Sequence, residues 1–182
     1  MTLPFFTIGH STRTIEEFVA LLREAGASMV VDVRTVPRSR TNPQYNRDTF
    51  GSTLAAVQIG YEHVAALGGL RGRQVPDDQS PNGFWENTSF RNYADYALTD
   101  GFRAGLDHLR EIGSRRNTAI MCAEAVWWRC HRRIIADYLL ASGERVFHIL
   151  GPHHIEPAAM TPGAVVLDTN RIVYPPGQPA LI

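Results

Sequence analysis

The sequence contains no lysine, because all 18 of its basic residues are arginine, and 18 acidic residues balance them. Schiff-base enzymes, pyridoxal-phosphate enzymes and P-loop nucleotidases each need a lysine at a defined place, so their usual mechanisms are excluded. The formal net charge of zero excludes a global field that would attract nucleic acid or a membrane surface. Any preference for an anionic ligand must therefore come from local arginine groups, whose forked donors suit phosphate and carboxylate.

Cysteine is also scarce, and the two present, Cys122 and Cys130, cannot build a disulfide framework. No positively flanked signal sequence stands at the N-terminus, so we expect a cytoplasmic protein. The longest apolar runs are far shorter than the roughly 20 residues that span a bilayer. We therefore expect no membrane partner.

The chain has 182 residues, of which 44% are hydrophobic, and this favours a single domain over 1–182. Short apolar strands are predicted at 3–9, 28–34, 61–64, 118–122 and 146–149, and they alternate with helices predicted at 14–26, 48–59, 90–98, 102–112 and 130–141. This alternation predicts an α/β fold, a three-layer sandwich with a mostly parallel sheet and helices on both faces. A C-terminal β-hairpin is expected at 164–174.

Local signals fix several boundaries. Thr14 and Glu17 have the spacing of a capping box, and Gly26 supplies a stop for the same helix. Asp48 is expected to cap the second helix. The segment 70–89 is rich in Gly, Pro, Asp and Asn and is read as a polar surface excursion or lid, while His153 and His154 are read as loop.

Reactive side chains follow three of the predicted strands, at the point where each strand ends. In parallel sheets the carboxyl ends of the strands meet at one edge, where α/β folds bind their ligands. We therefore expect these side chains to come together: His10 and Ser11 at the end of the first strand, Asp32 and Arg34 at the end of the second, and Cys122 and Glu124 at the end of the fourth.

Three interpretations of the thiols stay open. Cys122 is a candidate nucleophile or redox thiol with Glu124 or His10 as acid or base, because a cation or a helix N-terminus lowers the pKa of a nearby thiol. Cys130 and His131 open a predicted helix and could equally be packed in the core. Cys122, Cys130 and His131 could instead bind a metal, although eight positions between the cysteines is wider than the usual spacing of zinc ligands.

Candidate anion-binding residues lie around the same strand ends and in the loop after the second strand. The candidates are Ser11, Asp32, Arg34, Ser39, Arg40, His131 and Arg132. All of them except Asp32 carry a hydroxyl, guanidinium or imidazole group, which suits a phosphate or carboxylate. Trp127 and Trp128 are expected either to stack on a base or ring or to cover the end of the sheet.

Several ordered motifs together resemble the prokaryotic family catalogued as domain of unknown function 488. They are 7–11 (TIGHS), 31–34 (VDVR) followed by Pro37, Ser39 and Arg40, 67–69 (LGG), 122–124 (CAE) and 130–132 (CHR). The resemblance covers a core of about 7–149 and leaves 150–182 as a C-terminal extension. It implies no reaction, because none is established for the family.

The leading hypothesis is a small enzyme that acts on an anionic, phosphate-like or nucleotide-like substrate at the carboxyl edge of the sheet. One alternative is a non-catalytic nucleotide or nucleic-acid binding module that uses Arg34, Arg38, Arg40, Trp127 and Trp128. The other is a metal-binding protein that uses the two thiols and His131. The sequence predicts no particular cofactor and no oligomeric state.

Overall fold

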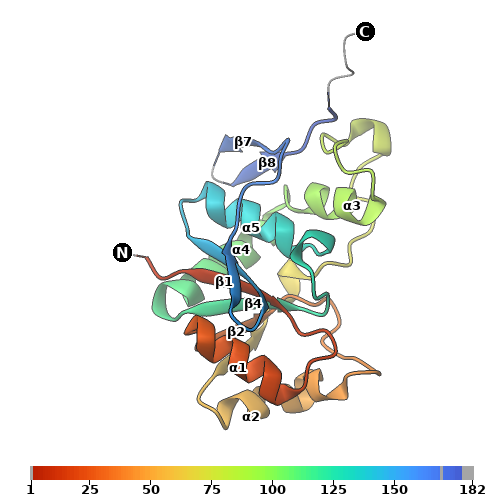
Figure 1. Ribbon diagram of the computed structural model, residues 1–182. Helices are drawn as coiled ribbons and strands as arrows, with labels where there is room; N and C mark the ends of the chain where they lie inside the picture. Colours follow the sequence, from red (N-terminus) through yellow and green to blue (C-terminus); the bar gives the residue numbers. More distant parts are fainter. Residues whose placement is uncertain (1, 169, 178–182) are drawn as a thin grey trace.

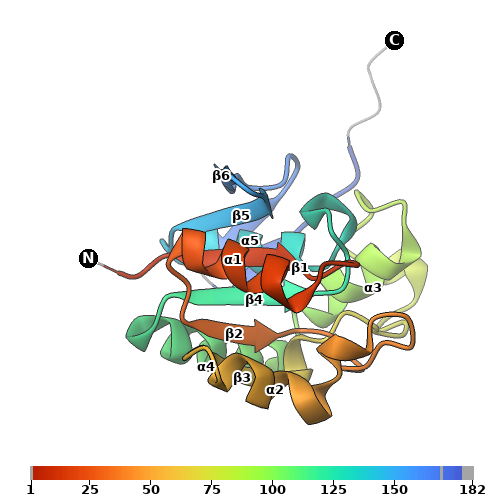
Figure 2. The ribbon, with the colours of Figure 1, turned by 60° about the horizontal axis from the view of Figure 1, so that its bottom comes forward.

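The computed structural model describes residues 2–168 and 170–177 and contains a six-stranded sheet. Figures 1 and 2 show how the helices and strands are arranged. The strand order is β3-β2-β4-β1-β5-β6. The first five strands are parallel and β6 is antiparallel to β5. The strands are β1 (Phe5–Gly9), β2 (Met29–Asp32), β3 (Gly60–His63), β4 (Thr118–Cys122), β5 (Val146–Gly151) and β6 (His154–Pro157).

Helices cover both faces of the sheet, which confirms the predicted three-layer α/β fold (Figure 2). They are α1 (Ile15–Ala25), α2 (Arg47–Ala55), α3 (Thr88–Tyr96), α4 (Asp100–Arg115) and α5 (Arg132–Ala141). Successive strand residues point to opposite faces. Accordingly Val30 belongs to the same buried cluster as Phe18 of α1, whereas Val31 belongs to the cluster that contains Leu109 of α4 and Ile134 of α5.

The predicted C-terminal hairpin is confirmed as β7 (Val165–Asp168) and β8 (Arg171–Val173), although Thr169 of its turn lies outside the described residues. It lies beside α5 (Figure 1). The hydroxyl group of Tyr138 on α5 accepts a hydrogen bond of 3.1 Å from the amide of Ile172. Ile172 and Tyr174 thereby join the core on the α4 and α5 side of the sheet.

The local signals for α1 are confirmed in full. The Thr14 hydroxyl group accepts from the Glu17 amide, the Glu17 carboxylate accepts from the Thr14 amide, and Gly26 ends the helix with a left-handed φ of 71°. Two other expectations are wrong. The residue that caps α2 is Asn46 and not Asp48. His154 belongs to β6, because His153 takes a left-handed φ of 56° and turns the chain back along β5.

The segment 70–89 is anchored more firmly than its polar composition suggests. Asn82 and Trp85 are buried, and both Ser80 and Asn82 donate hydrogen bonds of 2.7 Å to Asp95 on α3. Trp85 also stacks on Phe90, with ring centroids 4.8 Å apart. Within 2–168 and 170–177, no helix has the length and apolar character needed to cross a bilayer.

Candidate functional site

The ends of three neighbouring strands form the edge of the sheet at which the sequence places its reactive residues. Gly9 of β1 pairs with Cys122 of β4, and Asp32 of β2 pairs with Met121 on the other side of β4. A cavity of about 320 Å³ opens at this edge. Its walls come from β4, from the loops after β2, β3 and β4, and from α3. They comprise Arg34, Thr35, Val36, Gly69, Leu70, Ser89, Phe90, Tyr93, Cys122, Ala123, Glu124, Arg129, Cys130 and His131.

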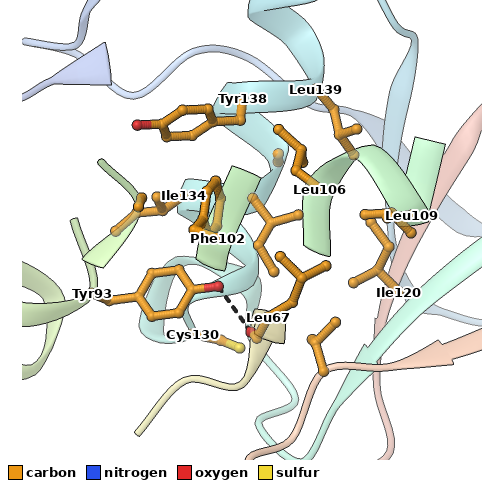
Figure 3. Close-up of a cluster of buried hydrophobic side chains, with 14 of the residues drawn as sticks. Leu67, Tyr93, Phe102, Leu106, Leu109, Ile120, Cys130, Ile134, Tyr138 and Leu139 are labelled. Atoms are coloured by element: carbon orange, nitrogen blue, oxygen red, sulfur yellow. Dashed lines mark hydrogen bonds between the residues drawn. The ribbon is translucent and has the colours of Figure 1, made fainter. Parts of the chain in front are cut away.

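The two cysteines meet at the wall of this cavity. Cys122 ends β4, and Cys130 follows the short 3-10 helix Trp127–Arg129. Their Sγ atoms lie 2.6 Å apart, and both residues are free cysteines. Only 4% of Cys122 and 5% of Cys130 is exposed. Figure 3 shows Cys130 at the border of the hydrophobic core, close to Tyr93 and Leu67.

Several polar groups converge on the sulfur of Cys130. The backbone amide and the Nε of Arg132 each donate to it at 3.4 Å, and Nδ1 of His131 lies 3.5 Å away. The Arg132 amide belongs to the first turn of α5, where N–H groups have no partner within the helix. The arrangement is suited to a thiolate rather than to a neutral thiol.

Arg132 gives the strongest electrostatic reason for a negative charge on that sulfur. Its guanidinium is always charged, yet only 1% of the residue is exposed. Its other acceptors are the Thr7 hydroxyl group at 3.4 Å and the backbone carbonyl of Glu124, both of which are neutral. Among the described residues no carboxylate forms an ion pair with Arg132, so a negative charge on the neighbouring pair of thiols is what can neutralise it. Of these two sulfur atoms, that of Cys130 accepts the hydrogen bond from Nε.

The two thiols therefore have opposite tendencies to ionise. Burial by itself would raise the pKa of Cys130, but the hydrogen bond from Cys122 and the neighbouring His131 and Arg132 outweigh it and hold that pKa well below its usual value. Burial raises the pKa of Cys122, and the hydrogen bond and the charge of Cys130 raise it further. At neutral pH the pair is best described as a Cys130 thiolate that accepts a hydrogen bond from the Cys122 thiol.

His131 is held in one orientation. Its Nε2 lies 2.8 Å from the carbonyl oxygen of Val33, and because a carbonyl can only accept, Nε2 carries a proton. Nδ1 faces the Cys130 sulfur, and it donates to a thiolate there when the ring carries a proton on both nitrogens. Tyr93 packs edge-on against the ring at a centroid distance of 5.0 Å, and a Cβ on Gly69 would collide with Nδ1.

Arg34 lines the cavity, but its guanidinium is largely used by internal partners. Nε and Nη2 donate to the two carboxylate oxygens of Asp32 at 2.9 and 2.7 Å. Nη2 also donates to the Tyr45 carbonyl at 2.7 Å, and the Tyr61 hydroxyl donates to Asp32 at 2.6 Å. The buried pair Asp32 and Arg34 therefore fixes the end of β2 and has little free capacity for a ligand.

His10 lies behind this pair and does not line the cavity. Its Nδ1 donates to the Ser11 carbonyl at 2.8 Å, so Nε2 can accept from Nη1 of Arg34, 3.3 Å away. The ring stacks on Tyr45 with a centroid distance of 4.1 Å. Burial is the main reason why the pKa of His10 falls to about 4, and the charge of Arg34 lowers it further. His10 is thus a neutral support for Arg34.

Other residues that the sequence nominated lie outside the walls of the cavity. Ser11 forms a tight turn with a φ of 48°, and its amide donates to the Ala123 carbonyl at 3.0 Å. The Ser39 hydroxyl group accepts from the Asn42 amide at 2.9 Å, and Arg40 is exposed. These residues shape loops around the site.

The structure adds residues that sequence reasoning missed. Phe90 and Tyr93 reach the cavity from α3, and Arg129 reaches it from the loop between the cysteines. Arg129 is exposed, and its guanidinium forms no ion pair with any other described residue. The position of Arg129 between the two cysteines was the one available signal, since nothing near Phe90 or Tyr93 in the sequence pointed to a site.

The tryptophans of that loop differ in environment. Trp127 stacks on His148 of β5 with a centroid distance of 4.3 Å and donates to Glu156 on β6 at 3.3 Å. It therefore covers the sheet, which is one of the two roles expected for it. Trp128 is 45% exposed and meets Trp127 edge-on.

The function of the site follows neither from a cluster of metal ligands nor from the comparisons with known proteins. In the described part of the chain, no three His, Cys, Asp or Glu side chains are grouped so that they could hold a metal ion. The family model described as "Domain of unknown function DUF488" matches residues 14–139. No curated protein and no solved structure matches the chain.

Proposed function

The chain belongs to the DUF488 family, and from the geometry of its site we propose an enzyme that uses a cysteine thiolate to act on a small anionic substrate. The observation that carries this proposal is the buried guanidinium of Arg132, which donates a hydrogen bond to the Cys130 sulfur and has no carboxylate partner among the described residues. A thiolate is the nucleophilic form of cysteine. This one is at the wall of a cavity, where a substrate can reach it.

The two thiols have separate roles in this proposal. Cys130 is the resting thiolate and the attacking group, and Cys122, which the sequence singled out first, supplies the adjacent S–H at 2.6 Å. Glu124 is exposed at the wall of the cavity and is the acid or base for a substrate proton. His10 and Asp32 are positioning residues that hold Arg34 at the edge of the site.

The substrate class follows from the walls of the cavity. Arg129 presents a guanidinium that forms no ion pair within the described part of the chain, and such a group suits a phosphate or carboxylate. Phe90 and Tyr93 offer aromatic surface for the rest of the molecule. A volume of about 320 Å³ is at the small end of ligand pockets. The proposed substrate is therefore a small electrophile with one anionic group and an apolar body.

Alkylation with two reagents tests this proposal. Iodoacetamide is neutral and iodoacetate is anionic, and both alkylate thiolates. We expect Cys130 to react in the native protein with a midpoint below the ordinary thiol pKa of about 8.5. Cys122→Ser should keep this reaction, and Cys130→Ser should lose it.

The anionic reagent probes the substrate class separately. Arg129→Gln should slow iodoacetate several-fold while leaving iodoacetamide almost unchanged, because a charge contact acts only on the charged reagent. Arg38→Gln is the matched control, since Arg38 is exposed and does not line the cavity. If both cysteines react only after unfolding, the thiolate proposal is wrong. If the Arg129 variant slows both reagents equally, the anionic substrate is wrong.

A further inference from the structure

Two thiols in contact, one of which ionises readily, can be oxidised to a disulfide as well as supply a nucleophile. The Sγ atoms of Cys122 and Cys130 lie 2.6 Å apart, and a disulfide bond is about 2.05 Å long. The two sulfur atoms are therefore in direct contact, as the formation of a disulfide requires. Both are at the wall of the same cavity, so an oxidant that reaches one sulfur meets the other.

We propose that Cys122 and Cys130 are a dithiol–disulfide couple through which the protein reduces a hydroperoxide. The proposal rests on the thiolate assigned to Cys130 under the proposed function and adds a redox activity to it. A hydroperoxide is small enough for the cavity, and its oxygen atoms are electrophilic toward a thiolate.

The first step is attack of the Cys130 thiolate on the terminal oxygen of the hydroperoxide. A sulfur–oxygen bond forms, the oxygen–oxygen bond breaks, and sulfur loses two electrons to give a sulfenic acid. The leaving alkoxide, or hydroxide from hydrogen peroxide, takes a proton from solvent. Arg129 lies at the wall of the same cavity and can stabilise the negative charge that leaves.

The second step is attack of Cys122 on the oxidised sulfur of Cys130. A disulfide bond forms and the sulfur–oxygen bond breaks, and hydroxide leaves with the Cys122 proton as water. The sum is one dithiol and one hydroperoxide converted to one disulfide, one alcohol and one water. An external dithiol returns the disulfide to the starting state by thiol–disulfide exchange.

The surroundings favour ready return to the reduced form. In the dithiol state the Cys130 thiolate neutralises Arg132, which is 1% exposed. In the disulfide that negative charge is gone, and the buried guanidinium keeps only neutral acceptors at Thr7 and Glu124. Stabilising the reduced form of a cysteine pair makes its disulfide more oxidising. This couple therefore turns over with a dithiol reductant instead of resting as a permanent crosslink.

The test uses the reduced full-length chain and hydrogen peroxide as the probe. Without a reductant, we expect one equivalent of peroxide to be consumed and the intact mass to fall by two hydrogen atoms, with a crosslinked peptide that contains both cysteines. With dithiothreitol present, consumption should continue for many turnovers, and Cys130→Ser should lower its rate at least tenfold.

Cys122→Ser separates the two steps. It should still consume one equivalent and should accumulate a Cys130 sulfenic acid that dimedone captures, without disulfide or sustained turnover. Cys122→Ala repeats the measurement should the serine variant fail to fold. Equal rates for wild type and Cys130→Ser, or oxidation of Cys130 to sulfinic acid without a disulfide, would overturn the proposal.

Iodoacetamide distinguishes this failure from failure of the proposed function. Rapid alkylation of Cys130 at neutral pH without a peroxide-induced disulfide leaves the thiolate enzyme in place and removes the redox couple. A Cys130 that is inert to both iodoacetamide and peroxide contradicts both proposals.

Discussion

Acidification should destabilise the protein through His148, which is 2% exposed at the centre of β5. The Thr7 hydroxyl group accepts from Nη1 of Arg132, so its own proton is available to Nδ1 of His148 at 2.7 Å. Nδ1 is thus the unprotonated nitrogen of a neutral ring. Burial first, and then the charge of Arg132, lower the pKa of His148 from 6.5 to about 4.

The sign follows from which state binds the proton. Between pH 6.5 and pH 4 the unfolded chain protonates this histidine and the native state does not, so stability is full above pH 6.5 and falls as the pH falls. A difference of 2.5 pKa units corresponds to a limiting loss of about 3.4 kcal/mol. From pH 7 to pH 4.5 the contribution of His148 to the free energy of unfolding should fall by about 2.4 kcal/mol.

Urea unfolding at pH 7 and pH 4.5, followed by tryptophan fluorescence, measures this loss in wild type and in His148→Gln. Carboxylates contribute to the pH dependence of both proteins, and their contribution cancels in the difference between them. We expect the variant to lose about 2.4 kcal/mol less than wild type on acidification. Leu70→Gln is the control, because Leu70 is 75% exposed and carries no titratable group, so the pH dependence of that variant should match that of wild type. An equal loss in His148→Gln and wild type would refute the assignment.

Two further substitutions test the supports of the site. Asp32→Asn leaves the buried guanidinium of Arg34 without its charged partner and should lower the free energy of unfolding by about 3 to 5 kcal/mol in urea titrations. Gly69→Ala should displace His131 and slow alkylation of the reactive thiol several-fold, because the new Cβ would collide with the imidazole. Gly72→Ala should leave that rate unchanged, since a Cβ there meets nothing within 4 Å.

Different results would contradict these expectations. If Asp32→Asn lowers the free energy of unfolding by less than about 1 kcal/mol, the buried pair of Asp32 and Arg34 contributes no more than an exposed ion pair does. Unchanged alkylation in Gly69→Ala, with the fold intact, would show that His131 has no influence on the thiol.

Patterns of neighbouring residues in the sequence were sufficient to predict most of the helices and strands. The capping box at Thr14, the stop at Gly26 and the apolar run before Asp32 depend on residues close together in the chain, and the structure confirms the elements that they predict. The meeting of His10, Asp32 and Cys122 at one edge also followed from the sequence, because parallel strands place their carboxyl ends together. β6 was missed because a tight left-handed turn at His153 has no strong signature in the sequence.

The sequence by itself therefore determined the α/β architecture, the family and the edge of the sheet where the reactive residues gather. Only the tertiary structure decided how those residues are used. Burial turned Arg34 inward to Asp32 and Arg132 inward to Cys130, and this left Arg129 as the exposed cation of the cavity. Spacing along the chain cannot show which arginine loses its water and must find an internal partner, because that cost depends on the packing of distant segments.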